Sequence, residues 1–531
     1  MASAPTRESL PADPTLPLQD GKPAHAADRL QPQVPGPVPA RGRRLAWLDA
    51  LRGIAALCVV YAHFGTRVLP QVHRAVYNVF DPGLYGVLVF FLVSGYIVPA
   101  SLERKGSVRS FWLSRLFRLF PLFVFAIAGV LLLHEFGLAS VRGTNQDVTA
   151  SVFSHLFMLN ELLGQTNVIV VIWTLSYEMV FYVLLTALFT AGLHKRSGWY
   201  AAGFAAAALL LGGLLPTYWL SYSSLGLTPV AVTGDVLIMG GLAVAVVGRG
   251  RQRAAGAWLA AATALILVAV NGRKGPYEGL TILALMFTGT LLYRAERGQI
   301  SRGRAVTAAI GIFTVAIVAG AWHIPGASPQ NQAALLQREW VMSVALAGLT
   351  FAIGLALRNL PIPSVLAWLG LVSYSVYLMH PLLLDVYDSI RFTHSGHPVG
   401  LQVAVTGAFL AVLLACCALT YHLVEAPMQR LGRRAATWLD TRFGPDRPEP
   451  RAARESVPRR RAGTRNQPRR PREQAPLELH NGIKHVPVQF ESQSWLDPVS
   501  LARRHSRLRA TPACYPEHPA DQEIQHPNGA K

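Results

Sequence analysis

The chain has 531 residues, of which 51% are hydrophobic and only 15% are charged. A soluble globular protein carries about 25% charged residues, so this composition excludes an ordinary soluble enzyme or binding module. The net charge of +20 does not indicate nucleic-acid binding, because no aromatic residues interleave the arginines of the C-terminal tail. The apolar residues come in long blocks, which predicts an all-α polytopic transmembrane helical bundle.

The two ends of the chain lack the composition of a folded domain. Residues 1–44 are rich in Pro and Ala and contain no apolar stretch typical of a signal peptide. Residues 432–531 form a basic, Pro/Arg-rich tail. We predict that both segments are disordered, with the transmembrane domain at residues 45–431, and that the tail is attracted to anionic membrane lipids. Three of the four cysteines lie in apolar stretches, which argues against a disulfide framework.

Between these ends the apolar blocks predict roughly ten to twelve membrane spans of about 17–25 residues each. The residues 150–163 are too few to cross a membrane and are typical of a re-entrant or interfacial segment. The predicted spans are 46–66, 82–101, 117–137, 168–191, 200–220, 229–247, 255–271, 278–294, 304–323, 340–357, 364–387 and 401–424.

Positive charge in the connecting loops predicts the orientation of these spans. Loops on one side carry clusters such as Arg249, Arg251 and Arg253, whereas loops on the other side carry mostly isolated cations such as Arg74. Cytoplasmic loops of membrane proteins are enriched in Lys and Arg. The asymmetry therefore predicts a multi-pass protein of the inner (cytoplasmic) membrane with both termini in the cytoplasm.

The first apolar stretch contains an arginine and a histidine eleven residues apart, Arg52 and His63. Eleven residues turn an α-helix through about three revolutions plus roughly 20°, so both side chains share one face, about 16 Å apart along the axis. Ionisable side chains inside a span are expensive and indicate a functional site. The structural alternative pairs Arg52 with Asp49 and leaves His63 at the membrane interface.

Two further ionisable residues fall in the middle to outer part of the predicted membrane domain. Glu178 lies about ten residues, or roughly 15 Å, into the fourth span, and His380 lies in the outer third of the eleventh. Each has a structural alternative: Glu178 could bond a neighbouring helix, and His380 could satisfy the backbone opened by Pro381. Burying several such groups is costly, so together they favour a functional site.

An arginine pair stands where the third span leaves the cytoplasm. Arg115 and Arg118 are three residues apart and share a helix face. The planar guanidinium group makes bidentate hydrogen bonds to phosphate, so the pair could bind a phosphorylated ligand. The alternative is ordinary positive-inside charge with no ligand.

The order and spacing of six motifs resemble the acyltransferase 3 family, integral-membrane enzymes that mostly O-acylate sugars. The resemblance covers about residues 45–431. The fourth motif departs from the family pattern only at Thr174, where the family has serine, and in the fifth Pro381 directly follows His380. In chain order the matching residues are Leu48, Asp49, Arg52, Gly53 and His63; Phe90 to Ile97 with Ser94; Phe111, Arg115, Arg118, Leu119 and Pro121; Trp173, Leu175, Glu178, Phe181 and Tyr182; Ser373, Tyr374, Tyr377, Leu378 and His380; and Glu425, Ala426 and Pro427.

The resemblance implies a reaction between acyl-coenzyme A, with acetyl-coenzyme A the expected co-substrate, and a hydroxyl of a sugar, glycan or glycoside. His63 would be the general base, with Arg52 and Glu178 as further catalytic residues. Glu178 would orient the His63 imidazole or stabilise its imidazolium form, and His380 or Tyr374 would donate to the developing oxyanion or position the sugar. Neither a metal nor a permanently bound cofactor is expected. The implied substrate-binding residues are Arg115, Arg118, Ser94, Trp173, Tyr374, His380 and Glu425.

Two other classes of function remain open from the sequence. A transporter or flippase of a glycan or lipid-linked substrate would also carry intramembrane charge, although the two halves of the chain show no convincing repeat. A membrane protein that only binds a lipid-linked sugar is the other alternative. A thioester-dependent transfer assay separates all three.

Overall fold

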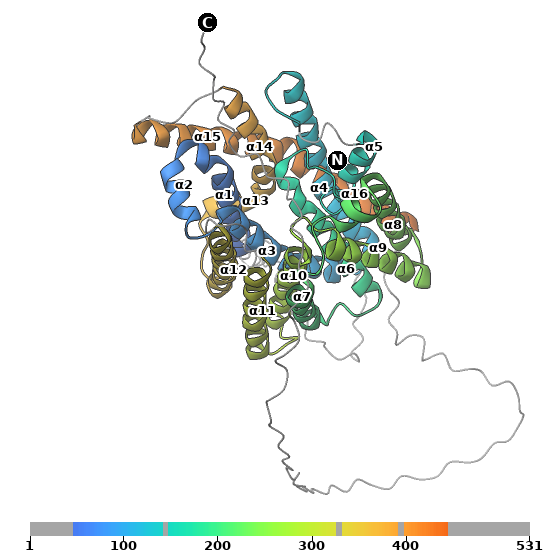
Figure 1. Ribbon diagram of the computed structural model, residues 1–531. Helices are drawn as coiled ribbons and strands as arrows, with labels where there is room; N and C mark the ends of the chain where they lie inside the picture. The colour runs from blue at the N-terminus through green and yellow to red at the C-terminus, as the bar shows by residue number, and fades with distance from the viewer. Residues whose placement is uncertain (1–45, 142–146, 325–331, 391–397, 444–531) are drawn as a thin grey trace, which may run out of the picture. The chain divides into compact units, whose positions relative to one another are not determined.

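The computed structural model describes residues 46–141, 147–324, 332–390 and 398–443. Of the segments predicted to be disordered, residues 1–44 and residues 444–531 of the 432–531 tail lie outside the described residues, whereas residues 432–443 are helical. The regular elements of the described ranges are helices, as expected for an all-α bundle (Figure 1). In chain order they are α1 (Ala46–Val68), α2 (Pro70–Tyr77), α3 (Pro82–Lys105), α4 (Val108–Glu135), α5 (Val148–Leu156), η1 (Val170–Ile172), α6 (Trp173–Thr190), α7 (Ser197–Leu211), η2 (Leu220–Ser224), α8 (Leu227–Val247), α9 (Gly250–Val270), α10 (Pro276–Glu296), α11 (Arg302–His323), α12 (Gln332–Ala356), α13 (Ser364–Leu371), α14 (Ser373–Ser389), α15 (Val399–Thr420), η3 (Tyr421–Glu425) and α16 (Ala426–Phe443).

Within the described residues, nine helices are long and apolar enough to cross a membrane, or ten if the bent pair α13–α14 is one span. The protein is therefore a multi-pass membrane protein, with spans at the lower end of the ten to twelve predicted. Helix α7 has only 15 residues, and α10 carries Glu278, Arg294 and Glu296 near its ends, which lowers its apolar character. Helix α5 is short, in agreement with the prediction that residues 150–163 do not cross by themselves.

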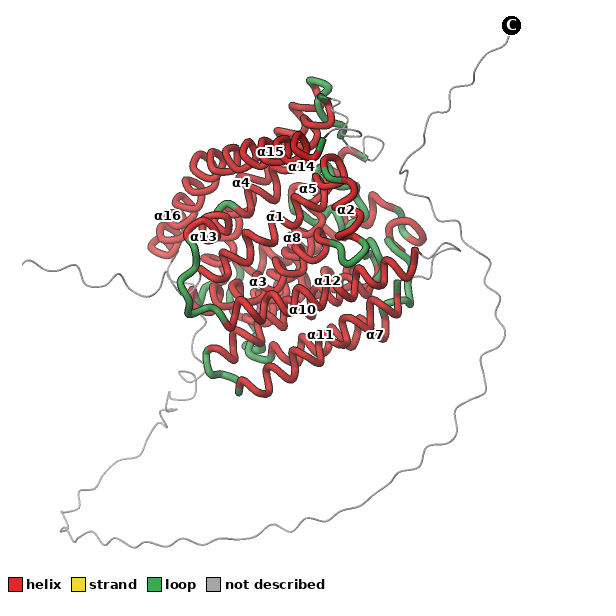
Figure 2. The backbone as a smooth tube through the Cα atoms, turned by 90° about the vertical axis from the view of Figure 1, so that its left-hand side faces the viewer, coloured by secondary structure: helices red, strands yellow, loops and turns green. Residues whose placement is uncertain are grey.

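The predicted eleventh and twelfth spans are not single, uninterrupted α-helices. The eleventh is broken into α13 and α14, which meet at 66°. The twelfth does not end at residue 424 but continues as α15, a π-helical turn at η3 and α16, a helical stretch of 45 residues. Figure 2 shows α16 leading away from α15 along one side of the bundle. The predicted boundary between residues 431 and 432 therefore falls inside α16, which packs against α4.

Helix α10 lies among α3, α7 and α11 (Figure 1), and most of its side chains are buried. Its approach to α3 is close because glycines stand at the crossing. A Cβ atom added to Gly95 would lie 1.9 Å from the carbonyl oxygen of Met286, and one added to Gly289 would lie 2.3 Å from that of Leu92. The Thr290 hydroxyl donates to the Gly95 carbonyl at 2.8 Å. Gly95 in the Leu-Val-Ser-Gly motif is thus a packing residue.

We expect Gly95→Ala to destabilise the bundle strongly, since the added methyl meets backbone rather than a movable side chain. Overpacking of this kind costs about 1–3 kcal/mol and sometimes more. Gly311→Ala in α11 is the matched control, because nothing lies within 4 Å of its added Cβ and Ala favours a helix. Thermal unfolding of both variants in detergent measures the difference. Equal unfolding temperatures would show that the α3–α10 crossing can relax.

Helix α1 is fixed against α3, α13 and α14, and this contact positions Arg52. A Cβ added to Gly370 would lie 1.9 Å from the carbonyl oxygen of Asp49, and one added to Gly53 would lie 2.7 Å from the Leu369 Cβ. The glycine of the Asp-x-x-Arg-Gly motif therefore lets the broken helix pack directly on the turn that carries Arg52.

Candidate active site

A single pocket is lined by five helices that carry the sequence motifs, α1, α3, α4, α6 and α14. It encloses about 750 Å³ of atom-free space, its open mouth included. We call it the arginine pocket. Its charged and hydroxyl-bearing lining residues are Arg52, Ser94, Arg115, Arg118, Thr174, Glu178, Ser373, Tyr374 and Tyr377.

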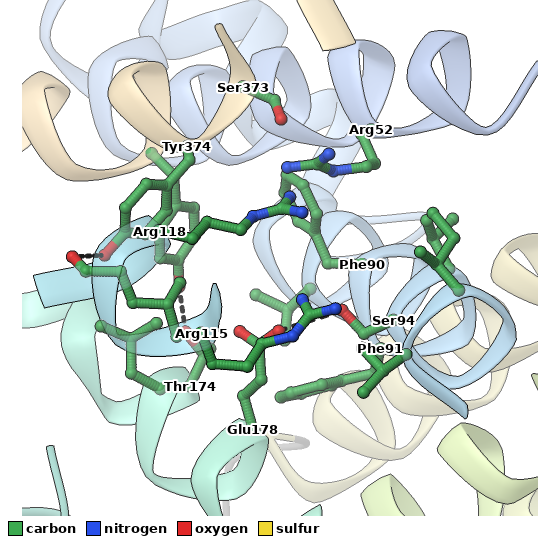
Figure 3. Close-up of a pocket in the computed structure, with 17 residues that line it drawn as sticks. Arg52, Phe90, Phe91, Ser94, Arg115, Arg118, Thr174, Glu178, Ser373 and Tyr374 are labelled. Atoms are coloured by element: carbon green, nitrogen blue, oxygen red, sulfur yellow. Dashed lines mark hydrogen bonds between the residues drawn. The ribbon is translucent and has the colours of Figure 1, made fainter. Parts of the chain in front are cut away.

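Three guanidinium groups reach the arginine pocket from two helices. Figure 3 shows the side chains of Arg52 and Arg118 directed toward one another, with Arg115 beside Glu178 and Ser94. Arg115 is only 7% exposed and lies over the Tyr182 ring at 5.3 Å. Among the described residues no carboxylate lies within 4.0 Å of Arg115 or Arg118, and the buried Nε of Arg115 has no hydrogen-bond partner. The three guanidinium groups outnumber the one carboxylate of the lining, that of Glu178, so the pocket offers excess positive charge to an anion.

Arg52 both approaches Asp49, as the structural alternative expects, and lines the pocket, as a functional role requires. Its Nη1 lies 4.0 Å from the Asp49 carboxylate, as the structural alternative expects. The same side chain nevertheless lines the arginine pocket. A pair at 4.0 Å is too long for a strong hydrogen bond, so Asp49 leaves most of the donors of Arg52 available.

Glu178 belongs to the arginine pocket. Its Oε1 accepts hydrogen bonds from the Ser94 hydroxyl at 3.3 Å and from the Tyr182 hydroxyl one helical turn away. These contacts place it among the arginines, and its expected role toward the His63 imidazole stays a prediction. Ser94, predicted from its motif alone, lies in the pocket as a hydrogen-bond donor to this carboxylate.

The two intramembrane histidines lie together. The rings of His63 on α1 and His380 on α14 are 5.4 Å apart, with their planes tilted by 33°. His380 is fully buried, and its Nδ1 lies 3.0 Å from the Val376 carbonyl oxygen. A carbonyl only accepts, so Nδ1 carries the proton and the neutral ring has its lone pair at Nε2. Among the described residues that buried Nε2 has no hydrogen-bond partner.

Tyr377 joins the histidine pair to the arginine pocket. It lines the pocket, and its ring lies 6.2 Å from that of His380 and 5.8 Å from that of Phe90. Its hydroxyl lies 2.8 Å from both the Thr174 Oγ1 and the Val171 carbonyl oxygen. Tyr377 was part of a quoted motif but was not predicted as a site residue; its position three residues before His380, on the same helix face, was the available signal.

The remaining predicted residues have different positions. Tyr374 lines the pocket and donates to the Leu119 carbonyl at 2.9 Å. Glu425 is buried outside the pocket lining and accepts from Ser375, so it ties η3 to α14. Trp173 also lies outside the lining, under the guanidinium of Arg273 at 3.5 Å. Among the described residues no three His, Cys, Asp or Glu side chains are grouped to hold a metal ion.

Comparison with known proteins gives a family and distant relatives. The model of the acyltransferase 3 family, described as an acyltransferase domain, matches residues 45–421. "Acyltransferase MdmB" of Streptomyces mycarofaciens is 32% identical over 184 residues, covering 32% of this chain and 47% of the relative. "Putative peptidoglycan O-acetyltransferase YrhL" of Bacillus subtilis (strain 168) is 27% identical over 170 residues, covering 29% of this chain and 25% of the relative.

These alignments are partial. The chain spans between a quarter and about half of the length of these curated relatives. No solved structure matches the chain. The family match, in contrast, covers most of the chain and contains five of the six motifs in full, among them those that build the arginine pocket and the histidine pair. The chain belongs to the acyltransferase 3 family.

Proposed function

We propose that this protein is a membrane-embedded O-acyltransferase that moves an acyl group, acetyl in the simplest case, from acyl-coenzyme A to a hydroxyl of a sugar or glycoside. One observation supports the proposal most directly. Tyr377 lines the arginine pocket, and its ring also lies next to that of His380, one member of the histidine pair. A cationic pocket suits the phosphates of a donor, and an imidazole suits removal of a hydroxyl proton.

The arginine pocket is the proposed donor site. Arg115 and Arg118 stand on α4 seven and ten residues after its first residue, Val108, which positive-inside loops predict to be at the cytoplasmic surface, where acyl-coenzyme A is made. Their guanidinium groups can bind phosphate oxygens bidentately. Arg52 extends the cationic lining to α1. Glu178 would hold Ser94 and Tyr182 in place along this pocket and limit repulsion among the arginines.

The histidine pair is the proposed site of proton transfer. In the reaction the acceptor oxygen bonds to the thioester carbonyl carbon, the C–S bond breaks, and the hydroxyl proton passes through imidazole to the departing thiolate. His63 would be the base. The protonated Nδ1 of His380 is committed to the Val376 carbonyl, so its free Nε2 is an acceptor. We therefore propose that His380 receives a hydrogen bond from the acceptor hydroxyl or from His63, and not that it donates to the oxyanion.

A transfer assay tests the proposed function. The purified protein in detergent or nanodiscs is given radiolabelled acetyl-coenzyme A and a panel of methyl glycosides, and O-acetylated products are separated and counted. Label transfer that depends on both partners is expected. A transporter or flippase would instead move a labelled glycan across a proteoliposome membrane without consuming thioester, and that result would overturn the proposal.

The boundary between the transmembrane domain and the C-terminal tail can be tested by truncation. The tail beyond Phe443 contains no family motif, whereas α16 packs on α4: the Ser110 hydroxyl donates to Asp440 at 3.2 Å, and a Cβ added to Gly432 would lie 2.6 Å from the Phe117 Cβ. A protein ending at Phe443 is expected to keep its turnover in detergent. A protein ending at Leu431 should lose stability and donor binding, because α4 carries Arg115 and Arg118. Loss of activity in the longer truncation would show that the tail takes part in transfer.

A further inference from the structure

A second, polar pocket lies beside the segment that leads into α6. We call it the amide pocket. Val170 lines the amide pocket, and Thr174, four residues later, lines the arginine pocket. Between them Val171 accepts the hydrogen bond from Tyr377, whose ring neighbours His380. The lining of the amide pocket is Gly164, Gln165, Thr166, Asn167, Val170, Tyr218 and Tyr222.

Gln165 is the unusual residue of this pocket. It is only 2% exposed, yet both its amide nitrogen and its amide oxygen lack a hydrogen-bond partner among the described residues. Burying an amide without partners costs about 1–3 kcal/mol on the scale of protein mutational data. Unpaired buried groups are rare in folded proteins and call for an explanation such as a missing ligand. The Gln165 amide offers such a ligand one acceptor and two donors.

The residues around Gln165 are held in place by bonds of their own. The Asn167 amide donates to Glu161 at 2.7 Å, and the Tyr218 hydroxyl donates to the same carboxylate at 2.8 Å. Burial and the neighbouring Glu161 carboxylate raise the pKa of Tyr218, so its hydroxyl keeps its proton. The Tyr222 hydroxyl donates to the Gly164 carbonyl at 3.2 Å. The tyrosine rings, 5.7 Å apart, therefore present fixed aromatic surface beside an unpaired amide.

Charge also selects the kind of ligand. Arg273 and Glu278 form a bidentate pair with both distances at 2.9 Å, and Glu161 lies 3.9 Å from the same guanidinium. Arg273, which lies beside the Glu161 carboxylate that holds Asn167 and Tyr218, is thus compensated by two carboxylates. A phosphorylated ligand finds no free positive charge among these groups. A neutral molecule with hydroxyls that both donate and accept, and with an apolar ring face, matches the amide and the tyrosines.

We infer that the amide pocket binds the sugar of the acceptor, through Gln165 and the faces of Tyr218 and Tyr222. This inference rests on the proposed function, since it places the acceptor in a pocket whose lining residue Val170 stands four residues before Thr174 of the proposed donor site. The loops that form the pocket, at residues 160–172 and 212–226, belong to the side that the positive-inside rule predicts to be outside. Binding energy from a sugar unit away from the reacting hydroxyl can be used to position that hydroxyl.

Gln165→Leu is the decisive variant, with Gln252→Leu as its matched control on an exposed part of α9. Because the Gln165 amide is unpaired in the fold, an apolar side chain of similar size should leave the unfolding temperature unchanged or raise it. If Gln165 only stabilised the fold, the substitution would instead lower the unfolding temperature. The acceptor KM should rise about tenfold or more, as expected for the loss of two hydrogen bonds, while the KM for acetyl-coenzyme A stays unchanged.

Binding is measured apart from chemistry by saturation-transfer difference spectra of methyl β-N-acetylglucosaminide and methyl α-glucoside. We expect ring-proton signals with the wild type and with Gln252→Leu, and weaker signals with Gln165→Leu. Equal signals or equal acceptor KM values in the two variants would overturn the inference, as would no binding of either glycoside to the wild type. If Gln165→Leu transfers acetyl groups with an unchanged acceptor KM, the amide pocket does not bind the acceptor, but the protein is still a transferase. Gln165-dependent binding without any thioester-dependent transfer refutes the transferase instead.

Discussion

His63→Ala is expected to lower the turnover of acyl transfer by about 10²–10⁴-fold, the usual contribution of a general base. The variant removes an imidazole that lies 5.4 Å from the His380 ring and deletes little packing, because His63 is only partly buried. Expression, membrane insertion and the unfolding temperature should therefore stay close to those of the wild type. Steady-state transfer with radiolabelled acetyl-coenzyme A measures the effect.

The controls for this prediction come from two other histidines. His422→Ala changes an exposed residue of η3 and should retain wild-type turnover. His380→Ala should be impaired if the two imidazoles act together, but it also removes the side-chain hydrogen bond to the Val376 carbonyl, so its unfolding temperature must be measured as well. Substantial turnover in purified His63→Ala would show that the base lies elsewhere.

The double variant Arg115→Ala/Arg118→Ala is expected to weaken coenzyme A binding by about 10²-fold or more. Hydrogen bonds to charged groups contribute about 1.5–3 kcal/mol each, and 1.4 kcal/mol corresponds to tenfold in affinity. Calorimetric titration with coenzyme A measures the loss. The KM for the glycoside acceptor should change much less, because neither arginine lines the proposed acceptor pocket.

Arg302→Ala/Arg304→Ala is the matched control for charge. Both arginines are exposed at the start of α11 and belong to a loop on the same predicted side of the membrane. If the positive-inside rule alone explained Arg115 and Arg118, the two double variants would bind coenzyme A equally well, and the donor site would have to be sought elsewhere. Arg118→Lys separates charge from geometry, since lysine keeps the charge but cannot bind phosphate bidentately.

The sequence predicted the broad fold and much of the composition of the arginine pocket. The spacing of Arg115 and Arg118, and the motifs that contain Ser94 and Tyr374, identified residues that line one pocket. The pairing of His63 with His380 was consistent with their similar predicted depth. Depth along a span follows from the number of residues, because every helical residue rises by about 1.5 Å.

Other features depend on how helices face one another, which a residue count does not determine. Glu178 has a depth compatible with His63, yet its rotation on α6 brings it to Ser94 and the arginines. The sequence of α10 predicts an apolar span, but the ends of this helix carry charged residues and its middle is buried among other helices. The amide pocket comes from loops, where local polarity is ordinary and only the folded structure shows that Gln165 lacks partners.

The break between α13 and α14 affects the electrostatics of the arginine pocket. Helix α14 begins at Ser373, and both Ser373 and Tyr374 line the arginine pocket. The start of a helix carries the positive end of its macrodipole, equivalent to about half an elementary charge. An unbroken span would have carried this end to the membrane surface, whereas the break places it beside the three guanidinium groups. The negative end of α13, which stops at Leu371, offsets part of it, and the 66° bend keeps the two dipoles from cancelling along one axis. Part of the attraction for an anion therefore belongs to the backbone, and anion binding should be reduced, not abolished, when a single arginine is replaced.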